Sequence, residues 1–170
     1  MKTLVAYFSQ TGNTRQVAEA IYEVIQGNKE MASIGELEDL EGYDLIFYGF
    51  PIQAMNPAKD AAEFLGLRGA GKKIALFITH GAPEDAERVG PWLDGSRDLA
   101  STVGAELVGL FNCQGEASQE IVDFLLNSDN PEFQRYGREG ALAKGLPDEA
   151  RLEKARDFAR QTLTQSAASD

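Results

Sequence analysis

Short runs of consecutive apolar residues recur along the chain. Leu4–Phe8, Leu45–Gly49, Ile74–Ile78 and Leu107–Phe111 are uninterrupted, which is typical of parallel strands that are buried on both faces. A weaker strand is expected near Glu30–Ile34. We expect the run that starts at Leu45 to break at the proline that follows it, Pro51.

The segments between these runs carry apolar residues at helical spacing. Helices are expected over Val17–Ile25, from Pro57 to Leu65, over Asp85–Val103 with a bend or restart at Pro91, and over Asp148–Thr164. Strands that alternate with helices predict right-handed βαβ units and an α/β fold. Five strands suit a doubly wound parallel sheet of order 2-1-3-4-5.

One segment interrupts this alternation. Gln114–Pro147 is long, polar and rich in turn residues, yet it contains the apolar stretch Ile121–Leu126. We expect one short helix there, followed by irregular chain. The segment leaves the edge of the sheet where ligands bind, so it is placed either to wall a ligand or to form a dimer contact. We expect a single domain over residues 1–165 that includes this segment (114–147), and a disordered tail over 166–170.

The charge of the chain narrows the classes of partner. The 170 residues include 16 basic and 27 acidic side chains, for a net charge of −11. Such an acidic chain is expected to repel nucleic acid and anionic membranes. It would suit a partner with a basic docking face, although acidic surfaces also serve solubility alone. With one cysteine, Cys113, no internal disulfide is possible, and the first apolar run is too short for a signal peptide. A cytoplasmic location is expected, and no metal site.

The loop after the first strand has the composition of a phosphate site. It reads Ser9, Gln10, Thr11, Gly12, Asn13 and Thr14, and it contains no Lys or Arg. Its hydroxyl groups can donate hydrogen bonds, and Gly12 allows a tight turn. The N–H groups at the start of the next helix carry partial positive charge. Together these groups can hold a phosphate dianion without a cation; the alternative is a plain helix cap after a strand.

The same residues carry a family resemblance. Leu4–Thr14 resembles the signature of the flavodoxin family, in which a strand is followed by S/T-x-T-G-N-T and a helix. The resemblance extends over nearly the whole chain in the order of strands and helices, and the long segment after the fifth strand departs from it. It implies a flavodoxin-like fold, non-covalently bound FMN and electron transfer.

Two further loops are expected to flank the flavin ring. The first follows the third strand and is uncharged; its candidate residues are Phe50, Pro51, Ile52, Gln53, Ala54 and Met55. The second follows the fourth strand and contributes Thr79, His80 and Gly81. His80 is the only histidine, and we expect it either to couple flavin reduction to a proton or to be an ordinary loop residue.

The first of these loops lacks a glycine between Phe50 and Asn56. The resemblance implies a backbone flip near the flavin, and such a turn needs a positive φ angle. Gln53 and Ala54 are poor at adopting one, and Asn56 is restrained by the proline after it. We therefore expect the neutral semiquinone to be less stabilised than in typical flavodoxins.

Three functions remain open from the sequence. The first is an electron carrier that serves a redox protein with a basic docking face or a small acceptor. The second is an NAD(P)H-dependent FMN oxidoreductase that acts on a quinone or another small acceptor. The third is a flavin-free interaction domain on the same fold, because fold does not fix function. Both a monomer and a homodimer are compatible with the sequence.

Overall fold

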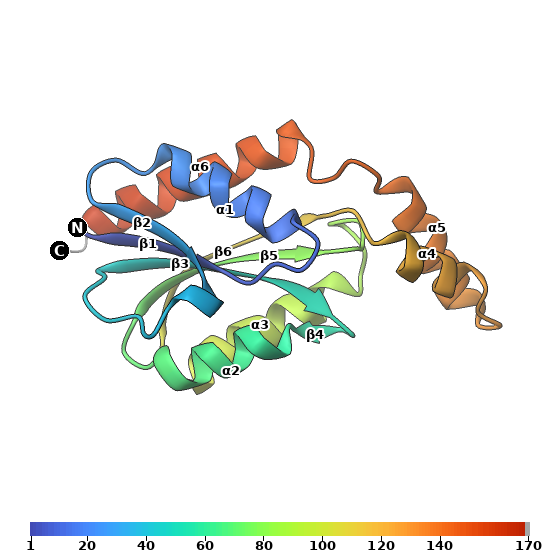
Figure 1. The fold of residues 1–170 in the computed structure, drawn as a ribbon, viewed down its shortest axis with the longest axis horizontal. Helices are drawn as coiled ribbons and strands as arrows, with labels where there is room; N and C mark the ends of the chain where they lie inside the picture. The colour runs from blue at the N-terminus through green and yellow to red at the C-terminus, as the bar shows by residue number, and fades with distance from the viewer. Residues whose placement is uncertain (169–170) are drawn as a thin grey trace.

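The structure is a computed structural model that describes residues 1–168, and a parallel sheet runs through its centre (Figure 1). The strands lie in the order β2-β1-β3-β5-β6. They are β1 (Thr3–Tyr7), β2 (Lys29–Ser33), β3 (Leu45–Gln53), β5 (Lys73–His80) and β6 (Glu106–Gln114). A two-residue strand, β4 (Asn56–Pro57), pairs antiparallel with the end of β3. Since β5 and β6 are the fourth and fifth strands of the parallel sheet, the predicted doubly wound order 2-1-3-4-5 is confirmed.

Helices cover both faces of this sheet (Figure 1). One face carries α1 (Asn13–Val24) and α6 (Glu149–Ala167), and the other carries α2 (Lys59–Arg68) and α3 (Val89–Thr102). A short 3₁₀ helix, η1 (Ile34–Glu36), follows β2. Within residues 1–168, no helix combines the length and the apolar character needed to cross a bilayer.

The alternation of side chains along the strands divides the core in two. Leu4 and Ala6 of β1 pack in the cluster beneath α2 and α3, whereas Val5 packs in the cluster beneath α1 and α6. All three are fully buried. The central strands are therefore apolar on both faces, which is why they appear as uninterrupted runs in the sequence.

The third strand is longer than the sequence predicted, since β3 continues through Pro51 to Gln53. The neighbouring strand β1 ends at Tyr7, so no ladder partner on that side requires an N–H from Pro51. The carbonyl oxygen of Pro51 instead accepts a hydrogen bond from the N–H of Ala58 at 3.0 Å. The strand thus carries the chain past the edge of the sheet and into a hairpin.

The third helix also differs from its predicted bounds. It begins at Val89 rather than at Asp85, and Pro91 lies in its first turn. A proline is tolerated there because the first N–H groups of a helix have no partner within the helix. Pro91 therefore belongs to the start of α3 rather than to a bend inside it.

The segment after β6 forms two helices instead of the expected short helix and irregular chain. They are α4 (Gln119–Leu126) and α5 (Pro131–Leu142), which pack on each other as a helical hairpin beyond the end of the sheet (Figure 1). Asn130 caps α5 by accepting a hydrogen bond from the N–H of Glu132. Gly137 and Gly140 lower the intrinsic helix propensity of α5, so sequence spacing alone missed it.

The expected tail over 166–170 is wrong in its first part. Helix α6 continues to Ala167, and the side chain of Ser166 is only 4% exposed. Residues 169–170 lie outside the described part of the chain. The helical body therefore extends past residue 165, where we expected the domain to end.

Gly49 provides a direct test of the packing between β3 and β5. A Cβ atom at Gly49 would lie 1.9 Å from Cε2 of Phe77, whose ring covers this position. We expect Gly49→Ala to lower the free energy of unfolding by about 1–3 kcal/mol. Gly66→Ala is the matched control, because no atom lies within 4 Å of the new Cβ. Gly66 lies in α2, where alanine has the higher helix propensity, so this variant should raise the free energy of unfolding by about 0.5–1 kcal/mol. Urea unfolding measures both; equal effects would contradict this packing.

Candidate functional site

The loop between β1 and α1 is folded around the side chain of Ser9. Its Oγ accepts hydrogen bonds from the N–H groups of Gly12 and Arg15, at 3.2 and 3.4 Å. Gly12 has a φ angle of +99°, which glycine adopts without strain, and it directly precedes the first residue of α1. The turn therefore directs the N-terminus of α1, with N–H groups that have no partner within the helix, toward the edge of the sheet.

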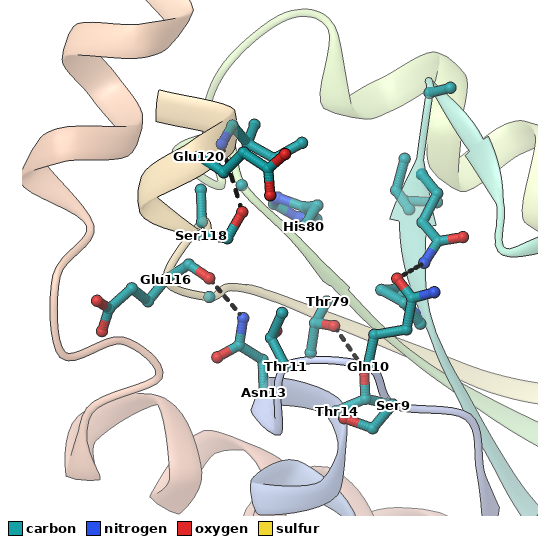
Figure 2. Close-up of a pocket in the computed structure, with 18 of the residues that line it drawn as sticks. Ser9, Gln10, Thr11, Asn13, Thr14, Thr79, His80, Glu116, Ser118 and Glu120 are labelled. Carbon is teal, nitrogen blue, oxygen red and sulfur yellow. Dashed lines mark hydrogen bonds between the residues drawn. The ribbon is translucent and has the colours of Figure 1, made fainter. Parts of the chain in front are cut away.

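Two side-chain contacts tie this loop to the neighbouring strands. The hydroxyl groups of Thr14 and Thr79 are 2.8 Å apart and buried, which joins the start of α1 to the end of β5. The amide of Gln53, at the end of β3, donates to Oε1 of Gln10 at 2.6 Å. Both bonds are visible in Figure 2. The three loops predicted to form the site are thus brought together.

A fourth segment joins them from the far side. The amide of Asn13 donates to the carbonyl oxygen of Glu116 at 2.8 Å (Figure 2). Gly115 allows this approach, because a Cβ at this position would lie 2.5 Å from Nδ2 of Asn13. The N–H of Gly115 also donates to the carbonyl oxygen of His80 at 2.8 Å. The chain that leads into α4 is therefore part of the site. This position is compatible with the first of the two roles expected for residues 114–147, which is to wall a ligand.

These segments enclose a cleft of about 640 Å³. The predicted site residues that form its walls are Ser9, Gln10, Thr11, Asn13, Thr14, Pro51, Ile52, Gln53, Ala54, Thr79, His80 and Gly81 (Figure 2). The other walls are formed by residues that the sequence did not identify as site residues: Gly115, Glu116, Ala117, Ser118, Glu120, Ile121 and Phe124. The missed residues belong to a long turn-rich segment. The signal that could have found them is the cap at Ser118, followed by the helically spaced Ile121 and Phe124.

Three predicted site residues do not line the cleft. Phe50 is fully buried in the core beneath α2 and α3. Met55 is 70% exposed and is not among the cleft-lining residues. Gly12 shapes the turn without forming a wall. The apolar residues that this loop contributes to the walls of the cleft are therefore Pro51, Ile52 and Ala54.

The turn between β3 and β4 has an unusual backbone. Ala54 and Met55 both have positive φ angles, +46° and +68°. Two such residues between paired strands form a hairpin turn that normally selects Asn-Gly. The side-chain amide of Asn56 donates to the carbonyl oxygen of Ala54 at 2.9 Å. Ala54 thus adopts a positive φ despite its low intrinsic preference for one, so the lack of a glycine does not prevent this turn. The weaker stabilisation of the semiquinone stays a prediction.

His80 lines the cleft but has both ring nitrogens engaged. Nδ1 lies 2.9 Å from the carbonyl oxygen of Ala82, and Nε2 lies 2.9 Å from Oδ1 of Asn112. The ring also makes an edge contact with Trp92, at 5.9 Å between centroids. Burial lowers the pKa of His80 below its ordinary value of 6.5, and the hydrogen bonds to Asn112 and Ala82 oppose that shift. Burial thus favours the neutral imidazole, whose single N–H can donate to only one of these two oxygen atoms.

The charged side chains that line the cleft are all acidic. Among its lining residues, all within the described chain, Glu116 and Glu120 are acidic and none is Lys or Arg. Nowhere in residues 1–168 do three or more His, Cys, Asp or Glu side chains group together as metal ligands would. A phosphate bound here would depend on N–H groups and hydroxyls rather than on cationic side chains.

Comparisons with known proteins agree with this architecture. Residues 4–160 match the flavodoxin domain family. The flavodoxin-like domain-containing protein BilS of Clostridioides difficile is 29% identical over 176 residues, 98% of this chain and 99% of that protein. Flavodoxin 1 of Salmonella typhimurium is 31% identical over 71% of this chain and 75% of its own. Oxidised flavodoxin 2 from Bacillus cereus has a similar fold, with a TM-score of 0.61, 20% identity and coverage of 97% and 99%.

The strain in the turn between β3 and β4 can be measured as a change in the free energy of unfolding. A residue other than glycine costs roughly 1–2 kcal/mol of stability when its φ angle is positive. A substitution by glycine removes this strain, but glycine loses more chain entropy on folding, and that loss offsets about half of the gain. We expect Met55→Gly to raise the free energy of unfolding by about 0.5–1 kcal/mol. The control Met55→Ala keeps the strain and loses little packing, because Met55 is 70% exposed. Equal stability of the two variants in urea unfolding would show that this turn is not strained.

The buried imidazole predicts a pH dependence of stability. Because the pKa of His80 is lowered in the folded chain, the unfolded chain binds this proton more readily. The contribution of His80 to stability is present above about pH 6.5 and is lost as the pH falls below it. We expect His80→Gln to reduce the difference in the free energy of unfolding between pH 7.5 and 5.5. An unchanged difference would mean that His80 titrates normally.

Proposed function

The chain belongs to the flavodoxin domain family, and from that premise we propose that it binds FMN non-covalently and transfers electrons. One observation supports this most strongly: the N-terminus of α1, with its hydroxyl-rich loop, opens into the same cleft as the ends of β3 and β5. A phosphate group and a planar ring joined by a chain would fit such a continuous site. FMN would supply the redox chemistry, and the protein would supply binding and orientation.

The phosphate of FMN is proposed to lie in the loop Ser9–Thr14. The turn around Gly12 leaves the N–H groups of the first turn of α1 unpaired within the helix, and Thr11 and Asn13 line the cleft beside them. Hydrogen bonds to a charged acceptor are stronger than neutral ones. A dianion could thus be held without a cation.

The flavin ring is proposed to lie between the β3–β4 turn and the end of β5. The walls there are Ile52, Gln53 and Ala54 on one side, and Thr79, His80 and Gly81 on the other. Uncharged walls suit an isoalloxazine ring, which is planar and largely apolar. With its ring buried and each ring nitrogen 2.9 Å from an oxygen atom, His80 is better placed to hold the shape of this wall than to exchange a proton rapidly.

The electrostatics of the cleft favour an electron carrier over an NAD(P)H-dependent reductase. A reductase must hold the pyrophosphate of NAD(P)H in addition to FMN, and the lining residues of this cleft include two glutamates and no Lys or Arg that could pair with this second anion. The net charge of −11 would instead steer a redox partner with a basic docking face toward the protein.

A direct experiment is to titrate the purified chain with FMN, follow flavin absorbance and fluorescence, and then add NADPH without any other protein. We expect FMN to bind with a stoichiometry of one and NADPH alone to leave the flavin oxidised. A chain that leaves the FMN spectrum unchanged would contradict FMN binding. Rapid bleaching by NADPH would support the reductase instead of the carrier.

The proposed role of the loop Ser9–Thr14 in phosphate binding can be tested by removing one of its hydroxyl groups. Thr11→Val removes a donor from the loop while keeping the shape of the side chain. A hydrogen bond to a charged group contributes about 1.5–3 kcal/mol, so we expect FMN to bind roughly 10- to 100-fold more weakly. Thr102→Val, at an exposed position in α3, is the matched control and should bind FMN normally. Equal affinities of the two variants would argue against a phosphate in this loop.

A further inference from the structure

Helix α4 presents two large apolar side chains to the cleft. Ile121 is 52% exposed and Phe124 is 70% exposed, and both are among the cleft-lining residues. Since they are three positions apart, they lie on the same side of α4. Exposed apolar side chains that gather at a cleft mark a binding surface. The cleft they line is the one that contains the phosphate loop.

The other walls of the cleft lack the large aromatic side chains that stack on a flavin. Phe124 is the only Phe, Tyr or Trp among the lining residues, all of which lie in the described part of the chain. Phe50 is fully buried in the core, and Trp92 packs against the ring of His80 rather than lining the cleft. A flavin ring bound here would therefore meet a Phe, Tyr or Trp side chain only from α4.

The position of α4 is fixed by close packing on α5. A Cβ at Gly137 would lie 2.9 Å from the backbone nitrogen of Leu126, and a Cβ at Gly140 would lie 3.3 Å from Cγ2 of Val122. These glycines let the two helices approach closely, with Val122 and Leu126 turned toward α5. Ile121 and Phe124 consequently remain free to face the cleft.

The helical hairpin is in turn attached to the body of the protein. Arg88, which directly precedes α3, forms an ion pair with Glu139 of α5. Its guanidinium also lies over the ring of Tyr136, at 4.0 Å from the centroid. Together with the bond between Asn13 and the carbonyl oxygen of Glu116, these contacts hold α4 beside the cleft.

We propose that Phe124, with Ile121 beside it, covers the outer face of the FMN ring, so that the α4–α5 hairpin is the outer wall of the flavin site. This inference rests on the proposed binding of FMN. Apolar contact with Phe124 and Ile121 would remove the ring face from water and leave its edge open between α4 and the β3–β4 turn. Phe124 would thus be a cofactor-positioning residue of the flavin site.

The test uses the full chain loaded with FMN and needs no activity. Phe124→Ala should weaken FMN binding about 2- to 10-fold, by loss of an aromatic contact, and should increase quenching of the bound flavin's emission by iodide. Phe124→Trp should quench the emission of bound FMN, because an indole in contact with the excited flavin donates an electron to it, and the electron returns to the indole without emission of light. Phe124 is 70% exposed in the absence of ligand, so neither variant disturbs the core.

Phe133→Ala and Phe133→Trp are the matched controls, since Phe133 lies on α5, is 40% exposed and does not line the cleft. They should leave affinity, iodide quenching and flavin emission unchanged. If the natural chain binds FMN and the Phe124 variants behave like the Phe133 variants, the proposed wall is wrong while FMN binding stands. If the natural chain does not bind FMN, the proposed function itself fails.

Discussion

The arrangement of the site depends on how the chain enters α1. Gly12 takes a left-handed conformation, Ser9 accepts two N–H groups of the turn, and the helix begins at once. This directs the positive end of the helix dipole at the edge of the sheet where β1, β3 and β5 end. The hydroxyl bond between Thr14 and Thr79 then fixes the start of α1 relative to β5. Because none of the cleft-lining residues is Lys or Arg, the attraction of an anion to this cleft depends on this helix end.

The same helix end organises the fourth wall of the cleft. Asn13, the first residue of α1, reaches across to the carbonyl oxygen of Glu116, and Gly115 leaves the room for it. The chain is thereby directed into the α4–α5 hairpin, which Arg88 attaches to the body on its other side. The segment that departs from the family's order of strands and helices is thus in direct contact with the start of α1.

Local features of the site could be predicted from the sequence, and non-local ones could not. The loop Ser9–Thr14 is readable because its hydroxyls, its glycine and the helix that follows act over a few residues. The contact between Asn13 and Glu116 spans 103 positions, and nothing in the sequence near either residue indicates it. The low helix propensity of Gly137 likewise hid α5, although that glycine is what lets α4 approach.

The same distinction between local and non-local features applies to the fold. Buried strands such as β1 are apolar on both faces and were predicted directly, whereas the extension of β3 through Pro51 depends on where its neighbour ends. The positive φ angles of Ala54 and Met55 contradict local preference. They follow from the pairing of β3 with β4, which leaves only two residues for the turn.

The central claim is that the start of α1 recognises a phosphate group that is joined to a ring in the adjoining cleft. Calorimetric titration of the chain with FMN and with riboflavin, which differ only in that phosphate, tests it most directly. Loss of charge-assisted hydrogen bonds worth about 1.5–3 kcal/mol predicts that riboflavin binds at least roughly tenfold more weakly than FMN. Equal affinities for the two ligands would contradict the account.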